Sequence, residues 1–141
     1  MVSCHFDEHI KVSWEDMGLS AELLRGIKAL NFERPSSIQQ YAIPAILSGR
    51  DVVVQAHEKT GRTVALVIST LQRLALFDDK YQILILEPTR EKAEHTLALI
   101  SSIGGDMGVK CYLCTGGTRV KQEAARLSEG NFQVVVGTPG R

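Results

Sequence analysis

The stretch Asp51-Val-Val-Val-Gln-Ala-His-Glu-Lys-Thr-Gly-Arg-Thr63 decides how this 141-residue chain is expected to fold. It predicts a buried strand over residues 52–55, a short loop, and a long apolar helix that begins near Arg62. A strand that turns through a glycine-containing loop into a helix is the layout of a phosphate-binding loop. In such a loop, backbone N–H groups and the positive end of the helix hold a polyphosphate.

Two positions depart from the usual form of this loop, which ends in Gly-Lys-Thr after small residues. Lys59 stands where glycine is expected, and Arg62 stands where lysine is expected. If the first position needs a positive φ, the β-carbon of Lys59 costs about 1–2 kcal/mol. Arg62 keeps the positive charge, but its larger, planar guanidinium does not fit a site shaped for the compact ammonium of a lysine. Lys59 offers an ammonium from a neighbouring position. We therefore expect weakened phosphate binding.

Composition indicates one domain of an ordinary globular protein, with 44% apolar and 23% charged residues. Sixteen basic and sixteen acidic residues cancel, so overall charge neither supports nor excludes nucleic acid. No segment approaches the ~20 continuous apolar residues of a membrane span, and we expect no membrane partner. Three cysteines, an odd number, indicate a reducing compartment, either cytoplasmic or nuclear.

Beyond residue 51, apolar strands alternate with helices. We expect a flexible lead-in over residues 1–13 and one partial domain over residues 14–141. The expected helices span residues 20–30, 36–47, 62–76, 89–103 and 120–128, and the further strands span residues 82–86, 111–115 and 132–136. Near-continuous Val, Ile and Leu runs between helices predict an α/β fold, a parallel sheet covered on both faces. Ligands gather at the carboxyl ends of such strands, so the informative loops are residues 56–61, 87–90, 116–118 and 138–141.

Gln39 and Trp14 each have two interpretations. Gln39 can close a capping box with Ser36 at a helix start, which is the commoner use, or its carboxamide can pair with adenine. Trp14 can cover a base or belong to the core.

Three other stretches follow expected strands. The stretches Pro88-Thr-Arg-Glu91 and Thr138-Pro-Gly-Arg141 each place a capping threonine and an arginine at a helix start. Free N–H groups and the arginine there can meet a phosphate, or the stretch can be a solvated first turn. Gly116-Gly117 permits either close backbone approach to a ligand or a tight turn.

The cysteines favour structural roles. Cys111 and Cys114 are three residues apart in an expected strand, so they point to opposite faces and favour the core over redox or metal chemistry. Cys4, His5 and His9 have no evident fourth ligand, which favours a terminus that binds no metal.

Taken in order, these stretches resemble the first RecA-like domain of DEAD-box ATP-dependent RNA helicases, from Trp14 almost to the end of the chain. The matching stretches are the aromatic Trp14, the Q motif at residues 32–39, motif I at 56–63, motif Ia at 88–91, the GG motif at 116–117 and motif Ib at 138–141. Residues 23–27 and 38–43 further resemble the translation-initiation and exon-junction subgroup. The resemblance implies a RecA-like parallel sheet with helices on both faces.

The resemblance also implies ATP and Mg²⁺ as cofactors, and single-stranded or duplex RNA, bound without sequence readout, as the partner. It implies protein partners from translation or mRNA processing. The implied ATP-binding residues are Trp14, Arg34, Gln39, Lys59, Thr60, Gly61, Arg62 and Thr63, with Thr63 ligating the Mg²⁺ that the nucleotide carries. The implied RNA-binding residues are Pro88, Thr89, Arg90, Gly116, Gly117, Thr138, Pro139, Gly140 and Arg141.

The chain reaches Arg141 before any Asp-Glu-Ala-Asp motif, Ser-Ala-Thr motif or second RecA-like domain. The expected sheet is therefore truncated before the strand that carries the Asp-Glu-Ala-Asp motif. In the family those parts hold magnesium and supply an arginine finger. We therefore expect no catalytic residue in this chain and no ATP hydrolysis by the chain alone. The alternative is a catalytically lapsed scaffold or RNA clamp with a degenerate motif I. A small-molecule kinase explains the phosphate-binding loop but leaves the other motifs as coincidences.

Overall fold

The computed structural model describes residues 12–78, 80–117 and 119–141. The helices are α1 (Ala21–Ala29), α2 (Ser37–Leu47), α3 (Arg62–Arg73), α4 (Arg90–Ile103) and α5 (Val120–Ser128), and short 3-10 turns cover Glu15–Met17 and Gly105–Met107. The strands are β1 (Ile83–Leu86), β2 (Cys111–Cys114) and β3 (Val134–Gly137). All five expected helices are confirmed, although α3 ends before residue 76 because Leu74 adopts an extended backbone.

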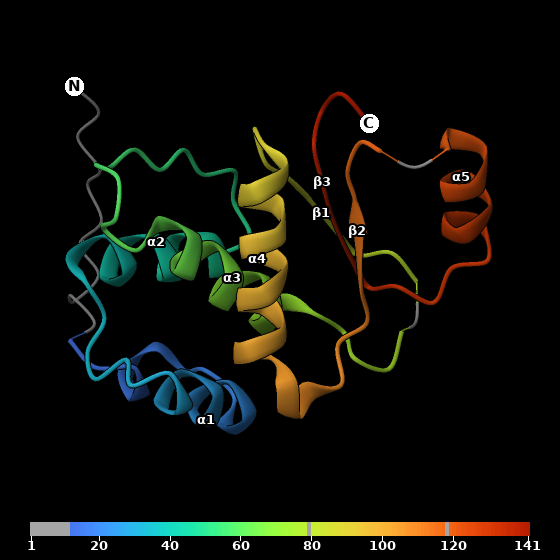
Figure 1. Ribbon diagram of the computed structural model, residues 1–141. Coiled ribbons are helices and arrows are strands. Elements are labelled where there is room, and N and C mark those ends of the chain that lie inside the picture. The colour runs from blue at the N-terminus through green and yellow to red at the C-terminus, as the bar shows by residue number, and fades with distance from the viewer. Residues whose placement is uncertain (1–11, 79, 118) are drawn as a thin grey trace.

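The strands form a parallel sheet in the order β1-β3-β2, with Val134 opposite both Ile83 and Cys111. Helix α4 connects β1 to β2, and α5 connects β2 to β3. Helices α1 to α4 gather on one side of the sheet and α5 lies on the other, as Figure 1 shows. The expected parallel sheet with helices on both faces is therefore confirmed.

The strand predicted over residues 52–55 is wrong. Residues 51–57 run in no regular structure, and Val53 is 97% exposed. A strand needs a neighbour that bonds its N–H and C=O groups, and within the described residues the three strands pair only with one another. The apolar run thus predicts burial, but it does not supply the partner strand that burial requires.

The core lies between the sheet and helices α1 to α4. Helix α1 approaches α4 so closely that a β-carbon on Gly26 would lie 1.9 Å from the carbonyl oxygen of Ile103. In β1, by contrast, Leu84 and Leu86 are 65% and 58% exposed at an edge of the sheet. The largest fully buried apolar side chains include Trp14, Leu23, Ile27, Ile43, Ile68, Leu71, Ile100 and Ile103. No helix among the described residues has the length and apolar character needed to cross a membrane.

Candidate functional site

Two side chains at the start of α2 hold the Q motif against the phosphate-binding loop (residues 56–63, the P-loop). The Ser36 hydroxyl donates to the carbonyl of Thr60 at 2.8 Å. The Gln39 carboxamide accepts from the backbone N–H of Ser36 at 2.8 Å and donates to the carbonyl of Gly61 at 3.3 Å. Gln39 is buried and takes part in a capping box, as one interpretation expected. The same carboxamide also fixes the P-loop to α2.

The P-loop contains two residues in the left-handed backbone region. Lys59 has φ +61°, and Gly61, which caps the start of α3, has φ +100°. The condition set for Lys59, a positive φ, is therefore met, and its β-carbon carries the associated strain. A β-carbon on Gly61 would lie 2.4 Å from the Gln39 nitrogen, so only glycine fits beside that carboxamide. Thr60 closes the turn by donating to the carbonyl of His57 at 2.8 Å.

Arg62 and Thr63, the last two residues of the P-loop and the first two of α3, line two adjoining cavities. One cavity of about 750 Å³ also has Glu87 in its wall, and a second of about 450 Å³ has Lys59 and Gly61 in its wall. Lys59, Arg62 and Arg34 are exposed. Lys59 and Arg62, the basic residues expected to meet phosphate, therefore stand in solvent next to the N-terminus of α3, where an anion is favoured.

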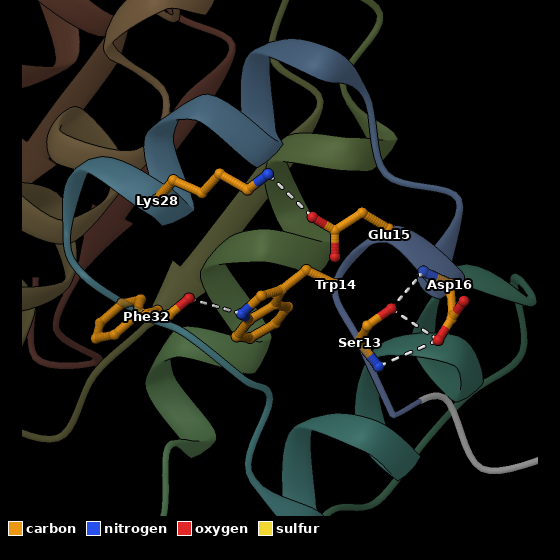
Figure 2. Close-up of polar contacts among 6 residues, drawn as sticks. All are labelled: Ser13, Trp14, Glu15, Asp16, Lys28 and Phe32. Atoms are coloured by element: carbon orange, nitrogen blue, oxygen red, sulfur yellow. Dashed lines mark hydrogen bonds and ion pairs between the residues drawn. The ribbon is translucent and has the colours of Figure 1, made fainter.

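Trp14 lies in the core and presents no open face to a base. It is 2% exposed, and its indole N–H donates to the carbonyl of Phe32 at 2.9 Å, as Figure 2 shows. Beside it, Lys28 forms a 3.0 Å ion pair with Glu15, and this contact lowers the pKa of the Glu15 carboxyl. Trp14 thus fixes the backbone that enters the Q motif. Of its two interpretations, the structure supports the core residue.

The loops that follow the three strands meet at one edge of the sheet. The N–H of Glu87 donates to the carbonyl of Gly137 at 2.8 Å, and the N–H of Thr138 donates to the carbonyl of Cys114 at 3.2 Å. A β-carbon on Gly117, which has φ +113°, would lie 3.6 Å from the Arg90 guanidinium. The stretches expected to meet RNA are therefore neighbours, and we call residues 87–90, 116–117 and 138–141 the sheet-edge loops.

The arginines of these loops have different surroundings. Arg90 is exposed and pairs with Glu94 one helical turn away at 3.0 Å. Arg141 instead pairs with Glu123 of α5, and the two side chains are only 11% and 8% exposed. Arg90 is therefore available to a ligand in solvent, whereas Arg141 faces the protein.

Thr89 is the N-cap residue of α4. Its hydroxyl accepts from the N–H of Lys92 at 3.3 Å, as expected for a capping threonine. Hydrogen bonds from the Glu91 backbone and from Thr89 lower the pKa of the Glu91 carboxyl. Pro88, Gly116, Pro139 and Gly140 are exposed around this helix start and the neighbouring loops.

Glu123 is a buried partner of the sheet-edge loops that the sequence reasoning missed. It is the buried residue of α5, and it lies four residues before the half-buried Leu127 on the same helix face. An acid on an otherwise apolar stripe was the available signal, because a buried carboxylate requires a charged or hydrogen-bonding partner. Here that partner is Arg141.

The cysteines remain structural in character. Burial raises the pKa of the Cys111 thiol to about 11. Burial and the nearby Glu123 carboxylate also raise the pKa of the Cys114 thiol. Both thiols are therefore protonated at neutral pH and poor nucleophiles. The described residues contain no group of three His, Cys, Asp or Glu that could hold a metal, and Cys4, His5 and His9 lie outside them, as does Thr118.

The sequence model of the family described as DEAD/DEAH box helicase matches residues 36–141. The chain belongs to the DEAD/DEAH box helicase family. The match to the family model begins at Ser36, whose hydroxyl bonds the start of α2 to the P-loop, and it includes all three sheet-edge loops. The small-molecule kinase alternative is thereby excluded.

Curated relatives and solved structures of DEAD-box helicases agree with this assignment. The chain is 47% identical over 141 residues to the ATP-dependent RNA helicase eIF4A of Schizosaccharomyces pombe, covering 100% of this chain and 36% of that protein. It is 48% identical over 140 residues to eIF4A of Neosartorya fischeri, covering 99% and 35%. The chain therefore spans about a third of the length of these relatives.

The fold is that of RecA-like DEAD-box helicase domains. Saccharomyces cerevisiae Dbp5 bound to RNA and ADP BeF3 matches with a TM-score of 0.82 at 35% identity, over 91% of this chain and 32% of that chain. A DEAD box protein from Methanococcus jannaschii matches with a TM-score of 0.85 at 30% identity, over 93% and 36%.

Proposed function

We propose that this chain is the N-terminal, nucleotide- and RNA-binding part of a DEAD-box ATP-dependent RNA helicase. The carrying observation is the direct contact between the Q motif and the P-loop, in which Gln39 donates to the carbonyl of Gly61 at 3.3 Å. This contact puts a carboxamide suited to adenine beside a backbone suited to phosphates. Relatives named as ATP-dependent RNA helicases support the same function.

In this proposal Gln39 and Arg34 select adenine. A carboxamide has two N–H donors and two acceptor lone pairs on its oxygen. Gln39 uses one donor on Gly61 and one lone pair on Ser36, so one of each remains for the adenine edge. Arg34 is exposed two residues before Ser36, the N-cap of α2, and completes the base site.

The P-loop would hold the phosphates through its backbone, Lys59 and Arg62. Thr63 supplies a hydroxyl oxygen, a hard donor that suits Mg²⁺. In this proposal Mg²⁺ arrives with the nucleotide, where it neutralises phosphate charge. We expect no ATP turnover by this chain alone.

The sheet-edge loops would bind the RNA backbone. Arg90, the capped start of α4 and Gly117 lie together there, and they offer a cation, N–H groups and close approach. Such contacts read shape and phosphate, so RNA of any sequence would bind. We further propose protein partners from translation or mRNA processing, and a cytoplasmic or nuclear location.

Calorimetric titration of ATP with Mg²⁺ tests the nucleotide site. We expect weaker than micromolar binding by the natural chain, because Lys59 is strained and Arg62 replaces a lysine. The double substitution Lys59→Gly with Arg62→Lys should tighten binding, whereas Lys121→Met on α5 should change nothing. Micromolar or tighter binding by the natural chain would contradict this account.

The strained Lys59 also favours a second candidate, a lapsed helicase that keeps only its RNA-binding or scaffold role. The same double variant separates the two functions. Restored ATP binding supports a working nucleotide site in the intact protein. Unchanged weak binding, together with RNA binding that falls in Arg90→Ala, supports the lapsed form.

A further inference from the structure

The strongest unassigned feature is a face of α4 turned toward the P-loop. Lys92, His95 and Leu99 recur at intervals of three and four residues, so they share one face of this helix. All three line the 450 Å³ cavity that Lys59 and Arg62 also line. Residues of α3, α4 and the P-loop thus line the same open space.

The two cavities of this region adjoin. Arg62, Thr63, Lys92 and His95 are common to both linings. Lys92 and His95 therefore face the same open space as the first two residues of α3.

This space is rich in cations. Lys59, Arg62 and Lys92 are exposed, and none of the three forms an ion pair with the residues that the structure describes. The smaller cavity has a single carboxylate, Glu58, against them. In the larger cavity the Glu87 carboxylate accepts from the Thr96 hydroxyl at 2.7 Å, and Asp51 is the other acid. Cations gathered in this way repel one another until an anion lies between them.

Lys92 also sits where its own helix disfavours it. It is the third residue of α4, in the first turn, where the positive end of the helix dipole opposes a cation. A lysine at this place does not stabilise α4 through the helix dipole, whereas an anion bound in the cavity would favour it.

We infer that Lys92 and His95 form the far wall of the phosphate site and hold the terminal phosphates of a nucleoside di- or triphosphate against Lys59 and Arg62. This inference rests on the proposed nucleotide-binding function and extends its site to a second helix. A phosphate chain has the charge and the several acceptor oxygens that these donors require. Inorganic tripolyphosphate presents this phosphate chain without the nucleoside and is the probe used.

The test measures the Kd of inorganic tripolyphosphate and of ATP for the whole chain, at several salt concentrations. We expect Lys92→Met to weaken both by about threefold to tenfold and to reduce the salt dependence, since one exposed charge contact is lost. His95→Gln should act in the same direction with a smaller effect. Lys92→Arg, which keeps the charge, should retain most of the affinity. Lys121→Met on the distant α5 is the matched control.

The outcomes separate this inference from the proposed function. Loss of tripolyphosphate affinity in Lys92→Met but not in Lys121→Met supports the far wall. Equal affinity of Lys92→Met and the natural chain, or no tripolyphosphate binding by the natural chain, overturns it. If ATP does not bind the natural chain, the nucleotide function fails, while the tripolyphosphate comparison still decides the role of Lys92. If Lys92→Met does not fold, as judged by circular dichroism, a Lys92→Gln variant gives the same comparison.

Discussion

The P-loop and the sheet-edge loops are positioned by different means. The sheet-edge loops follow strands in parallel register, so backbone bonds such as Glu87 to Gly137 fix their places. The P-loop follows an extended run that belongs to no sheet, and side chains of Ser36 and Gln39 hold it instead. The comparison teaches that a binding loop can keep its position through a few side-chain contacts when its strand lacks neighbours. Such a loop then depends on single residues.

The largest effect is expected from Glu123→Gln, which tests the sheet-edge side. The substitution removes the buried carboxylate that pairs with the Arg141 guanidinium, and we expect a loss of about 3 kcal/mol in the free energy of unfolding. Urea denaturation measures this loss. Glu129→Gln, at an exposed acid just beyond α5, should be nearly neutral. Equal stability of the two variants would show that backbone bonding alone holds this side.

Gly61→Ala tests the P-loop. Its β-carbon combines a positive φ with a 2.4 Å approach to Gln39, so strain and a lost hydrogen bond together cost about 2–3 kcal/mol. We also expect ATP binding to disappear. Gly105→Ala is the control, because a β-carbon there meets nothing within 4 Å. An unchanged midpoint in urea for Gly61→Ala would mean that the loop moves freely away from α2.

Gln39→Leu removes the tie between the Q motif and the P-loop. It leaves the Ser36 N–H and the Gly61 carbonyl without this partner, and we expect a loss of about 2 kcal/mol. Faster hydrogen exchange over residues 56–61, with the sheet-edge loops unaffected, would sharpen the contrast between the two regions. Gln122→Leu on the surface of α5 serves as the reference. Hydrogen exchange that rises equally in all loops would contradict the view that the P-loop and the sheet-edge loops are held in place by different contacts.

Lys59→Gly should give the smallest change and the opposite sign. Removing a β-carbon at φ +61° relieves about 1 kcal/mol of strain, part of which the added freedom of the unfolded chain offsets. Thermal or urea unfolding detects the gain. Asn31→Gly, at φ +57°, should gain less, because asparagine tolerates this region better. A loss of stability in Lys59→Gly would show that the lysine side chain contributes a contact.

Much of the fold could be predicted from the sequence because helix signals are local. Ser20 and Thr89 cap α1 and α4 as expected, and glycine and apolar periodicity mark the elements that follow. The strand over residues 52–55 could not be judged in the same way. Its pattern is correct for a buried strand, but strand formation depends on partners far away in the chain, which no local pattern reveals.

For the candidate site too, the local features could be predicted from the sequence, and the contacts with distant residues could not. The contact between Gln39 and Gly61 agrees with the order of the motifs, and Lys59 takes the positive φ that its glycine-like position suggested. The inward turn of Arg141 toward Glu123 was not foreseen. A sequence shows which residues carry charge, but which way a long side chain points depends on the tertiary neighbour that competes for it.

The exposed edge of β1 has a practical consequence. Leu84 and Leu86 lie beside backbone groups that no strand among the described residues pairs, in the apolar run Ile-Leu-Ile-Leu. Bare edges of this kind recruit strands from other molecules and seed aggregates. Purification of this polypeptide at high concentration should therefore favour insoluble assemblies, and a charged substitution at Leu84 is the simplest means of keeping it dispersed.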